Sequence, residues 1–198
     1  MKILIGTNNK AKVRKYGTIL DELGIEYCTP KDLNLDMDVE ETGSTSEENS
    51  KIKATAYYEA TKMPVIVDDS GLLIDKFSKE DQPGVFVRRY KGKKLTDEEL
   101  IKTYSEKIEA VGGDTTGAFV IAITIIDEQG KMYTNILKHE RYFVSKPCEA
   151  RTEGYPMNSL IYNKDTQKYL AEEYQGEKIY KGNSFENDYN FIKSVLKK

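Results

Sequence analysis

Two adjacent carboxylates, Asp68 and Asp69, follow the short apolar run of residues 65–67 and precede Ser70 and Gly71. The run is β-branched and follows a proline, so it predicts a short buried strand. Neighbouring carboxylates at the end of such a strand repel each other and are costly to desolvate, so they require water, a turn or a cation. The pattern favours Mg²⁺ as the cation. The alternative is an ordinary turn, because Asp, Ser and Gly are typical turn residues.

A second candidate for chemistry lies near the start of the chain. Residues 2–6 predict an apolar strand, residues 7–12 a loop, and the following residues a helix by their apolar spacing. The cationic side chains of this loop and first turn are Lys10, Lys12 and Arg14. A strand-loop-helix junction directs backbone N–H groups and the positive helix end at one point, which suits a phosphate. No Walker or GxGxxG pattern is present, and the alternative is an asparagine that caps the helix beside solvated lysines.

A third candidate begins at Glu41. Thr45 and Glu48 have the spacing of a capping box, which predicts a helix that starts just after Thr45. Asn49 and Lys53 are four residues apart, so they share one helix face and can point at one ligand near Glu41. The alternative is a solvated face of Glu and Lys side chains.

The elements that position these residues predict an α/β fold with a mixed β-sheet flanked by helices. The early strands are separated by helices, whereas the strands predicted at 118–126 and 132–144 are joined by a turn at Gln129 and Gly130. A second capping box, Thr96 with Glu99, predicts another helix, and a last amphipathic helix is predicted at 186–196. The length of 198 residues predicts a single domain over residues 1–198.

Composition excludes several classes of protein. The net charge of −3 disfavours non-specific nucleic-acid binding, and Cys28 and Cys148 form neither a zinc motif nor a disulfide framework. No apolar run reaches the length of a membrane-spanning helix and the first residues lack a signal-peptide core, so no membrane partner and a cytoplasmic location are expected. His139 is the only histidine and is expected to be structural.

Four motifs, taken in order along the chain, resemble those of the inosine triphosphate pyrophosphatase family. The matching residues are Thr7, Asn9 and Lys12, then Glu41, Thr42, Gly43, Glu48, Asn49 and Lys53, then residues 68–72, then residues 83–90. The resemblance implies Mg²⁺-dependent hydrolysis of inosine, deoxyinosine and xanthosine triphosphates to a nucleoside monophosphate and pyrophosphate. It also implies an elongated, two-lobed molecule with the active cleft between the lobes, and a homodimer.

With this resemblance, the candidate residues acquire roles. We expect Mg²⁺ to bridge Glu41, Asp69 and the triphosphate, and Asp69 to orient or deprotonate the attacking water. Asp68 is either a second metal ligand or the base instead. The residues expected to bind the substrate are Thr7, Asn9, Lys12, Lys53, Ser70, Gly71 and, from the C-terminal part, Lys178.

The C-terminal half departs from the family pattern. Residues 153–162 lack the Asp-Pro of the family's aromatic-G-Y-D-P segment, and residues 178–184 lack its histidine and arginine. The resemblance assigns these segments to the purine base. Two alternatives therefore remain, which are the same hydrolytic scaffold acting on a different nucleotide, and a non-catalytic nucleotide-binding protein.

Overall fold

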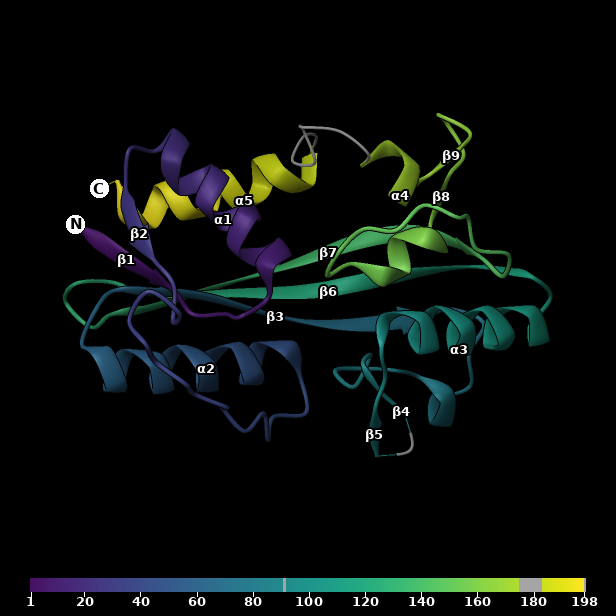
Figure 1. Cartoon of the computed structure of the whole chain (residues 1–198), viewed down its shortest axis with the longest axis horizontal. Helices are drawn as coiled ribbons and strands as arrows, with labels where there is room; N and C mark the ends of the chain where they lie inside the picture. Colours follow the sequence, from purple (N-terminus) through teal and green to yellow (C-terminus); the bar gives the residue numbers. More distant parts are fainter. Residues whose placement is uncertain (91, 175–182, 198) are drawn as a thin grey trace. The chain divides into compact units, whose positions relative to one another are not determined.

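The computed structural model describes residues 1–90, 92–174 and 183–197, and the chain divides into two compact units (Figure 1). Unit 1 comprises Met1–Ser70, Ile121–Leu137 and Tyr180–Lys198. Unit 2 comprises Gly71–Val120 and Lys138–Ile179. A single domain over the whole chain, and the cleft implied by the resemblance, stay predictions.

A five-stranded sheet has the strand order β2-β1-β3-β6-β7. Its first three strands are β1 (Lys2–Ile5), β2 (Glu26–Cys28) and β3 (Val65–Ile74). Both neighbours of β1 run parallel to it, with Leu4 opposite Cys28 on one side and opposite Val65 on the other. Parallel neighbours require crossover connections, which here are the helices α1 (Lys10–Glu22) and α2 (Ser46–Thr61). The predicted strand-loop-helix and the helix after Thr45 are confirmed.

The other two strands are β6 (Asp114–Ile126) and β7 (Met132–Val144). They are neighbours in the sheet and joined by a tight turn at Gly130, whose φ of +76° suits glycine, so they are antiparallel and the sheet is mixed. β6 begins four residues before the predicted Ala118. The reason is that the amide of Asp75 donates to the carbonyl of Thr116 at 2.9 Å, which extends the pairing of β6 with β3.

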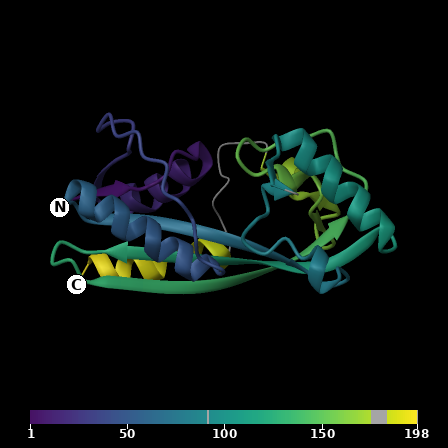
Figure 2. The ribbon, with the colours of Figure 1, turned by 90° about the horizontal axis from the view of Figure 1, so that it is seen from below.

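In unit 1, helices cover both faces of the sheet (Figures 1 and 2). α1 and α5 (Asn183–Leu196) cover one face, where Ile5, Tyr16 and Ile192 belong to one apolar core. α2 covers the other face, where Leu4, Ala54 and Val67 belong to a second core. Successive strand side chains point to opposite faces, so β1 and β3 supply residues to both cores.

The acidic pair lies inside β3 and not, as the sequence predicts, at the end of a strand. The strand does not end at Val67 but continues through Asp68 and Asp69 to Ile74, so the prediction of a short strand and the alternative of a turn are both wrong. β3 lies between β1 and β6 and its backbone has ladder partners on both sides. The carboxylates are tolerated inside a strand because each meets a lysine.

Unit 2 is built around α3 (Asp97–Ala110), which begins at the predicted capping box. Thr96 Oγ1 accepts from the amide of Glu99 at 3.3 Å, and Glu99 accepts from the amide of Thr96 at 2.9 Å. The helix ends before Gly112 and Gly113, which both have positive φ angles. Its buried face packs on Leu72, Ile74 and Phe143 in a third core.

The remaining elements of unit 2 are short. They are the 3₁₀ turns η1 (Lys79–Asp81) and η2 (Pro156–Ser159), the strands β4 (Arg89–Tyr90), β5 (Lys93–Lys94), β8 (Tyr162–Asn163) and β9 (Lys168–Tyr169), and the helix α4 (Leu170–Glu173). β4 pairs with β5 and β8 with β9, both antiparallel.

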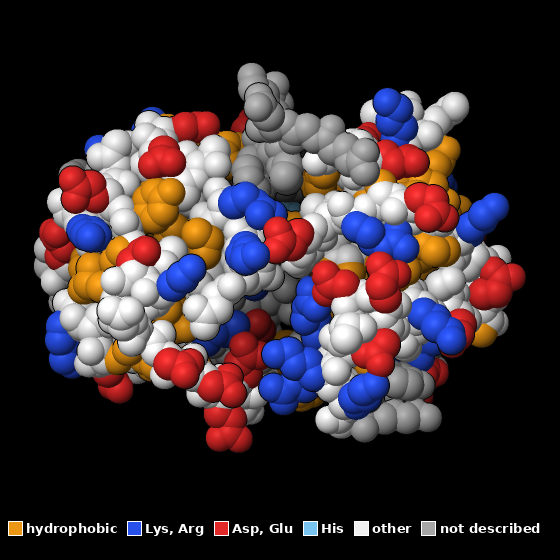
Figure 3. Space-filling model, in the orientation of Figure 1, with side chains coloured by type: hydrophobic (Ala, Val, Ile, Leu, Met, Phe, Trp, Pro, Cys, Tyr) orange, Lys and Arg blue, Asp and Glu red, His pale blue; other side chains and the backbone are white. Residues whose placement is uncertain are grey.

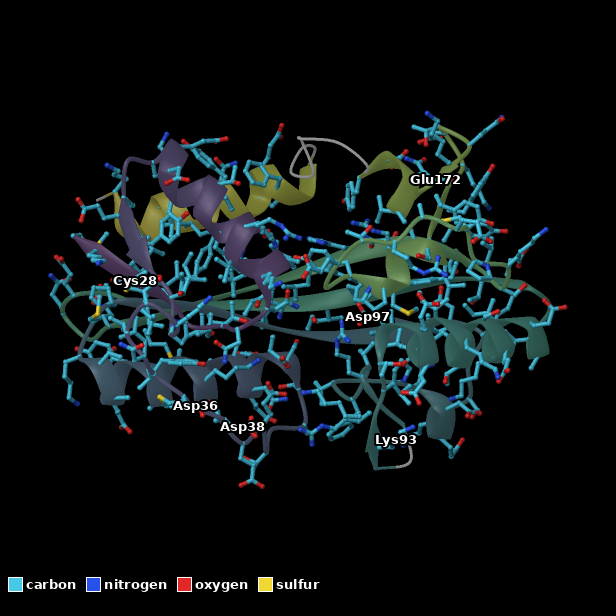
Figure 4. The ribbon with its side chains drawn as sticks, viewed as in Figure 1. Cys28, Asp36, Asp38, Lys93, Asp97 and Glu172 are labelled. Atoms are coloured by element: carbon cyan, nitrogen blue, oxygen red, sulfur yellow. The ribbon has the colours of Figure 1, made fainter. Side chains whose placement is uncertain are left out.

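The charged side chains at the surface and the two cysteines agree with the low net charge and the cysteine spacing of the sequence. On the face in Figure 3, acidic and basic side chains are interspersed. Both cysteines are free, and Cys28 lies buried on β2 (Figure 4). Within the described residues, no helix is long and apolar enough to cross a membrane.

Candidate active site

The loop before α1 is closed by its own side chains. Asn9 is the N-cap of the helix, and its Oδ1 accepts from the amides of Ala11 and Lys12 at 2.9 and 3.3 Å. Thr7 Oγ1 accepts from the amide of Asn9 at 3.2 Å. The capping alternative for Asn9 is therefore confirmed. Binding of phosphate by Thr7 and Asn9 stays a prediction, and the capped loop presents Lys12 in the first turn of α1.

The loop that carries Glu41 is fixed by Asn49. Asn49 is buried, and its Oδ1 accepts from the amide of Gly43 at 2.8 Å. A Cβ on Gly43 would lie 2.6 Å from Cβ of Glu48, so only glycine fits there. The side chain of Asn49 therefore folds this loop through Oδ1, and its facing a ligand together with Lys53 stays a prediction.

The predicted capping box at α2 forms only in part. Thr45 Oγ1 accepts from the amide of Glu48 at 3.1 Å, as expected. The carboxylate of Glu48, however, accepts from the amide of Ser44 at 2.7 Å and from its hydroxyl at 2.9 Å. These hydrogen bonds lower the pKa of Glu48 and tie the residue before the cap into the loop of Glu41.

Lys53 joins two of the predicted carboxylates. Its Nζ lies 2.7 Å from Oε1 of Glu41 and 3.0 Å from Oδ1 of Asp69. It also donates to the carbonyl of Asp68 at 3.3 Å. The alternative of a solvated Lys face is wrong for Lys53, whose side chain is only 15% exposed.

Asp68 and Asp69 meet different helices. Asp68 Oδ1 lies 2.8 Å from Nζ of Lys12 on α1, whereas Asp69 contacts Lys53 on α2. The preceding residues of β3 alternate in the same way, since Ile66 packs in the α1 core and Val67 in the α2 core. Alternation along the strand therefore separates two chemically identical neighbours onto opposite faces of the sheet.

Their environments shift the two carboxyl groups in opposite directions. Burial raises the pKa of Asp69, and Lys53 and Lys12 only partly offset it. Burial acts in the same direction on Asp68, but Lys12 and Lys15 outweigh it, so the pKa of Asp68 is lowered. Burial would lower the pKa of Lys53, but Asp69 and Glu41 raise it overall. Asp68 is thus a firmly anionic partner, and Asp69 is the better proton acceptor of the two.

A buried ion pair beside this site was not predicted from the sequence. Lys15 on α1 pairs with Asp188 on α5, whose side chain is fully buried. Burial raises the pKa of Asp188, Lys15 lowers it, and Asp68 raises it further, so the pair lies close to Asp68. The available signal was an aspartate within the apolar helix pattern at 186–196, and its partner lies far away in sequence.

The remaining predicted residues are placed as follows. Ser70 and Gly71 lie within β3. A Cβ on Gly71 would lie 3.1 Å from the carbonyl oxygen of Gly84, so close backbone packing alone accounts for this glycine. Lys178 lies outside the described residues. Donation to phosphate by the backbone of Ser70 and Gly71 stays a prediction.

Glu41 and Asp69 supply the oxygen atoms of a candidate magnesium site. Oδ2 of Asp69 is buried and accepts no hydrogen bond from the described residues, so it has capacity for a metal ion or a water molecule. Asp69 and Glu41 are hard oxygen donors of the kind that Mg²⁺ prefers, and they share Lys53. Over the described ranges, no three acidic, histidine or cysteine side chains form a metal-binding group. The two oxygen donors of Glu41 and Asp69 suit the ion, and ligation by Glu41, Asp69 and Asp68 stays a prediction.

Sequence comparisons identify relatives. A dITP/XTP pyrophosphatase of Halalkalibacterium halodurans is 31% identical over 195 residues, which cover 98% of this chain and 96% of that protein. A dITP/XTP pyrophosphatase of Leptospira interrogans is 40% identical over 127 residues. That match covers 64% of this chain and 63% of the relative, so this chain spans less than two thirds of its length.

The fold comparison agrees with the sequence comparisons. The solved structure of the Staphylococcus aureus Ham1 protein superposes with a TM-score of 0.76 at 26% identity, covering 100% of this chain and 98% of that one. Residues 3–179 match the Ham1 family. This match spans the loop of Lys12, the loop of Glu41, Lys53 and the acidic pair of β3. The chain therefore belongs to the Ham1 family.

Proposed function

We propose that this protein hydrolyses non-canonical purine nucleoside triphosphates, namely inosine, deoxyinosine and xanthosine triphosphates, to a nucleoside monophosphate and pyrophosphate with the help of Mg²⁺. Relatives in the family are named dITP/XTP pyrophosphatases. The observation that carries the proposal is the pairing of Asp68 with Lys12 and of Asp69 with Lys53 on the two faces of β3.

The charge of the site supports a role for Mg²⁺. The contacts of Lys12 and Lys53 join these two lysines to three carboxylates, those of Glu41, Asp68 and Asp69. A triphosphate is strongly anionic and would be repelled by this excess of negative charge. Mg²⁺ held by Glu41 and Asp69 would reverse the balance and neutralise charge on the phosphoryl oxygens.

The chain's own residues have separable roles in this proposal. Lys12 and Lys53 bind phosphate oxygens once they leave their carboxylate partners. Asp69, with its raised pKa and its unpartnered Oδ2, orients the attacking water and accepts its proton. Hydrolysis breaks the anhydride bond between the first and second phosphates. The oxygen of the water joins one of the two products, the nucleoside monophosphate or pyrophosphate, and the other product leaves with the former bridging oxygen. Asp68 stays anionic and is the resting partner of Lys12.

The test is a panel assay of the purified protein. Pyrophosphate and phosphate release are measured with inosine, xanthosine, deoxyinosine and the canonical triphosphates, with Mg²⁺ and with excess chelator. We expect pyrophosphate release that requires Mg²⁺ and is fastest with the three non-canonical purines. Release of phosphate alone, or activity unchanged by the chelator, would overturn the proposal.

A second candidate is the same hydrolysis of a different nucleotide. The absence of Asp-Pro in residues 153–162 and of the family's histidine and arginine in residues 178–184 favours it. The same panel decides, because canonical or pyrimidine triphosphates would then be the better substrates. Calorimetric nucleotide binding without turnover would instead indicate a non-catalytic nucleotide-binding protein. We also propose a homodimer, which light scattering of the eluting protein tests.

A further inference from the structure

The buried pair of Lys15 and Asp188 takes no direct part in the proposed hydrolysis. Lys15 lies three residues after Lys12 on α1, so the two lysines occupy one face of the helix. Its side chain is 12% exposed and its partner Asp188 is 0% exposed. Within the described part of the chain, no hydrogen bond reaches Oδ1 of Asp188. The charge of Lys15 is therefore held by a fully buried carboxylate and is largely shielded from bulk water.

Lys15 acts on Asp68 as well as on Asp188. It is the second-largest favourable charge on Asp68, after Lys12. Asp68 in turn disfavours the anionic form of Asp188, so both carboxylates lie within range of the charge of Lys15. Lys12 and Lys15 are thus two cations on one face of α1, one in contact with Asp68 and the other close enough for its charge to act on Asp68.

The two lysines differ in what they can do when substrate arrives. Lys12 contacts Asp68 directly at 2.8 Å and lies in the first turn of α1, at the phosphate loop. If Lys12 turns to a phosphate, a buried carboxylate loses its contact partner, which is costly in a low-dielectric environment. Lys15 cannot follow, because Asp188 holds it in place.

We propose that Lys15, held by Asp188, is a positioning residue that remains as the counter-charge of Asp68 and so lets Lys12 exchange Asp68 for a substrate phosphate. A buried ion pair is a poor source of stability compared with an apolar pair of similar size, so a role in the binding step explains why charges are placed here. The inference rests on the proposed function, because it requires Lys12 to bind phosphate.

The test compares Lys15→Met with the control Lys51→Met. Lys51 pairs with Glu47 on α2, in the same unit, and touches none of the site residues. With inosine triphosphate and Mg²⁺, we expect Lys15→Met to raise KM about tenfold, the effect of one charge-assisted contact, with kcat changed less than about twofold. Lys51→Met should leave both unchanged. Calorimetry with inorganic triphosphate should show the same weakening as KM.

A second variant separates positioning from structure. Lys15→Asp combined with Asp188→Lys keeps a buried ion pair but places an anion beside Asp68. The proposal predicts that this double variant regains thermal stability relative to Lys15→Asp alone, yet keeps a raised KM. Lys15→Arg should restore most of the affinity.

The outcomes are distinct. An unchanged KM in Lys15→Met, or full recovery of KM in the charge-swapped variant, would overturn the inference while leaving the hydrolysis intact. Absence of pyrophosphate release by the wild-type protein would instead overturn the proposed function. If Lys15→Met is unstable, Lys15→Arg and the charge-swapped variant still give the comparison of KM with kcat.

Discussion

The ion pairs of the candidate site in unit 1 differ from the exposed ion pairs of unit 2. Exposed pairs in unit 2 include Lys76 with Asp114, Arg88 with Asp97 at the start of α3, and Arg151 with Glu98. Each of these side chains is at least 38% exposed. Asp97 is labelled in Figure 4. In unit 1 the pairs of Lys12, Lys15 and Lys53 with aspartates have exposures of 16% or less. Surface pairs contribute little to stability, whereas buried charges are costly and point to function.

The largest expected effect comes from breaking a shared pair in unit 1. Lys53→Met leaves Glu41 and Asp69 without their cation, so we expect the free energy of unfolding to fall by about 3 kcal/mol. Pyrophosphate release should fall about a hundred- to a thousandfold, as for other lost contacts to a transition-state anion. Urea denaturation and a steady-state assay measure the two effects.

The matched change in unit 2 is Lys76→Met, which removes the exposed partner of Asp114. We expect neither the unfolding curve nor the rate to change measurably, because water replaces the lost contact. If Lys53→Met and Lys76→Met lowered stability and rate equally, burial of an ion pair would not determine its contribution.

The next effect separates the two neighbouring carboxylates. Asp69→Asn keeps the shape of the side chain but cannot accept a proton, so we expect kcat to fall about 10²–10⁴-fold. The circular dichroism spectrum should be unchanged. The exposed Asp114→Asn serves as the control in unit 2 and should retain full activity. If Asp69→Asn is as active as wild type, Asp69 is not the proton acceptor.

The smallest effect compares the two helix caps. Thr96→Ala and Thr45→Ala each remove one cap hydrogen bond, so each should lower the free energy of unfolding by about 1 kcal/mol. Only Thr45→Ala should also raise the Mg²⁺ concentration needed for half-maximal activity, because its cap adjoins the loop of Glu41. Equal Mg²⁺ requirements in the two variants would argue against coupling between that loop and the α2 cap.

The stability contributed by Glu99, the second residue of the capping box at α3, should depend on pH. Hydrogen bonds from Lys93 and from the amide of Thr96 lower the pKa of Glu99 to about 2. Because the folded pKa lies below the unfolded value, Glu99 contributes stability above its ordinary pKa, and this contribution is lost as the pH falls toward about 2. Glu99→Gln should abolish that part of the pH dependence in urea titrations.

Local patterns in the sequence predicted most of the fold. Spacing and caps located α1, α2 and α3 to within a few residues, since helix starts depend on neighbours three and four residues away. The motif residues Lys12, Glu41, Lys53 and the acidic pair were all identified, and the structure brings them together in two ion-pair groups.

What escaped prediction depends on contacts distant in sequence. The continuation of β3 through Asp68 and Asp69 requires lysines from two helices, which no local window contains. Lys15 and Asp188 form an ion pair although they lie near opposite ends of the sequence. The hydrogen bond between Asn49 and Gly43 was also not predicted, because it depends on the path of a loop and not on helical spacing.

The alternation of β3 also limits which length changes the gene can accept. One residue inserted between Pro64 and Asp68 would turn every following side chain to the other face, so the acids would exchange helices and the apolar residues would exchange cores. The connection at residues 29–40, which contains no strand and precedes the loop of Glu41, has no such parity to preserve. Insertions and deletions among natural variants should therefore accumulate in that connection. They should be absent from the part of β3 that precedes Asp68.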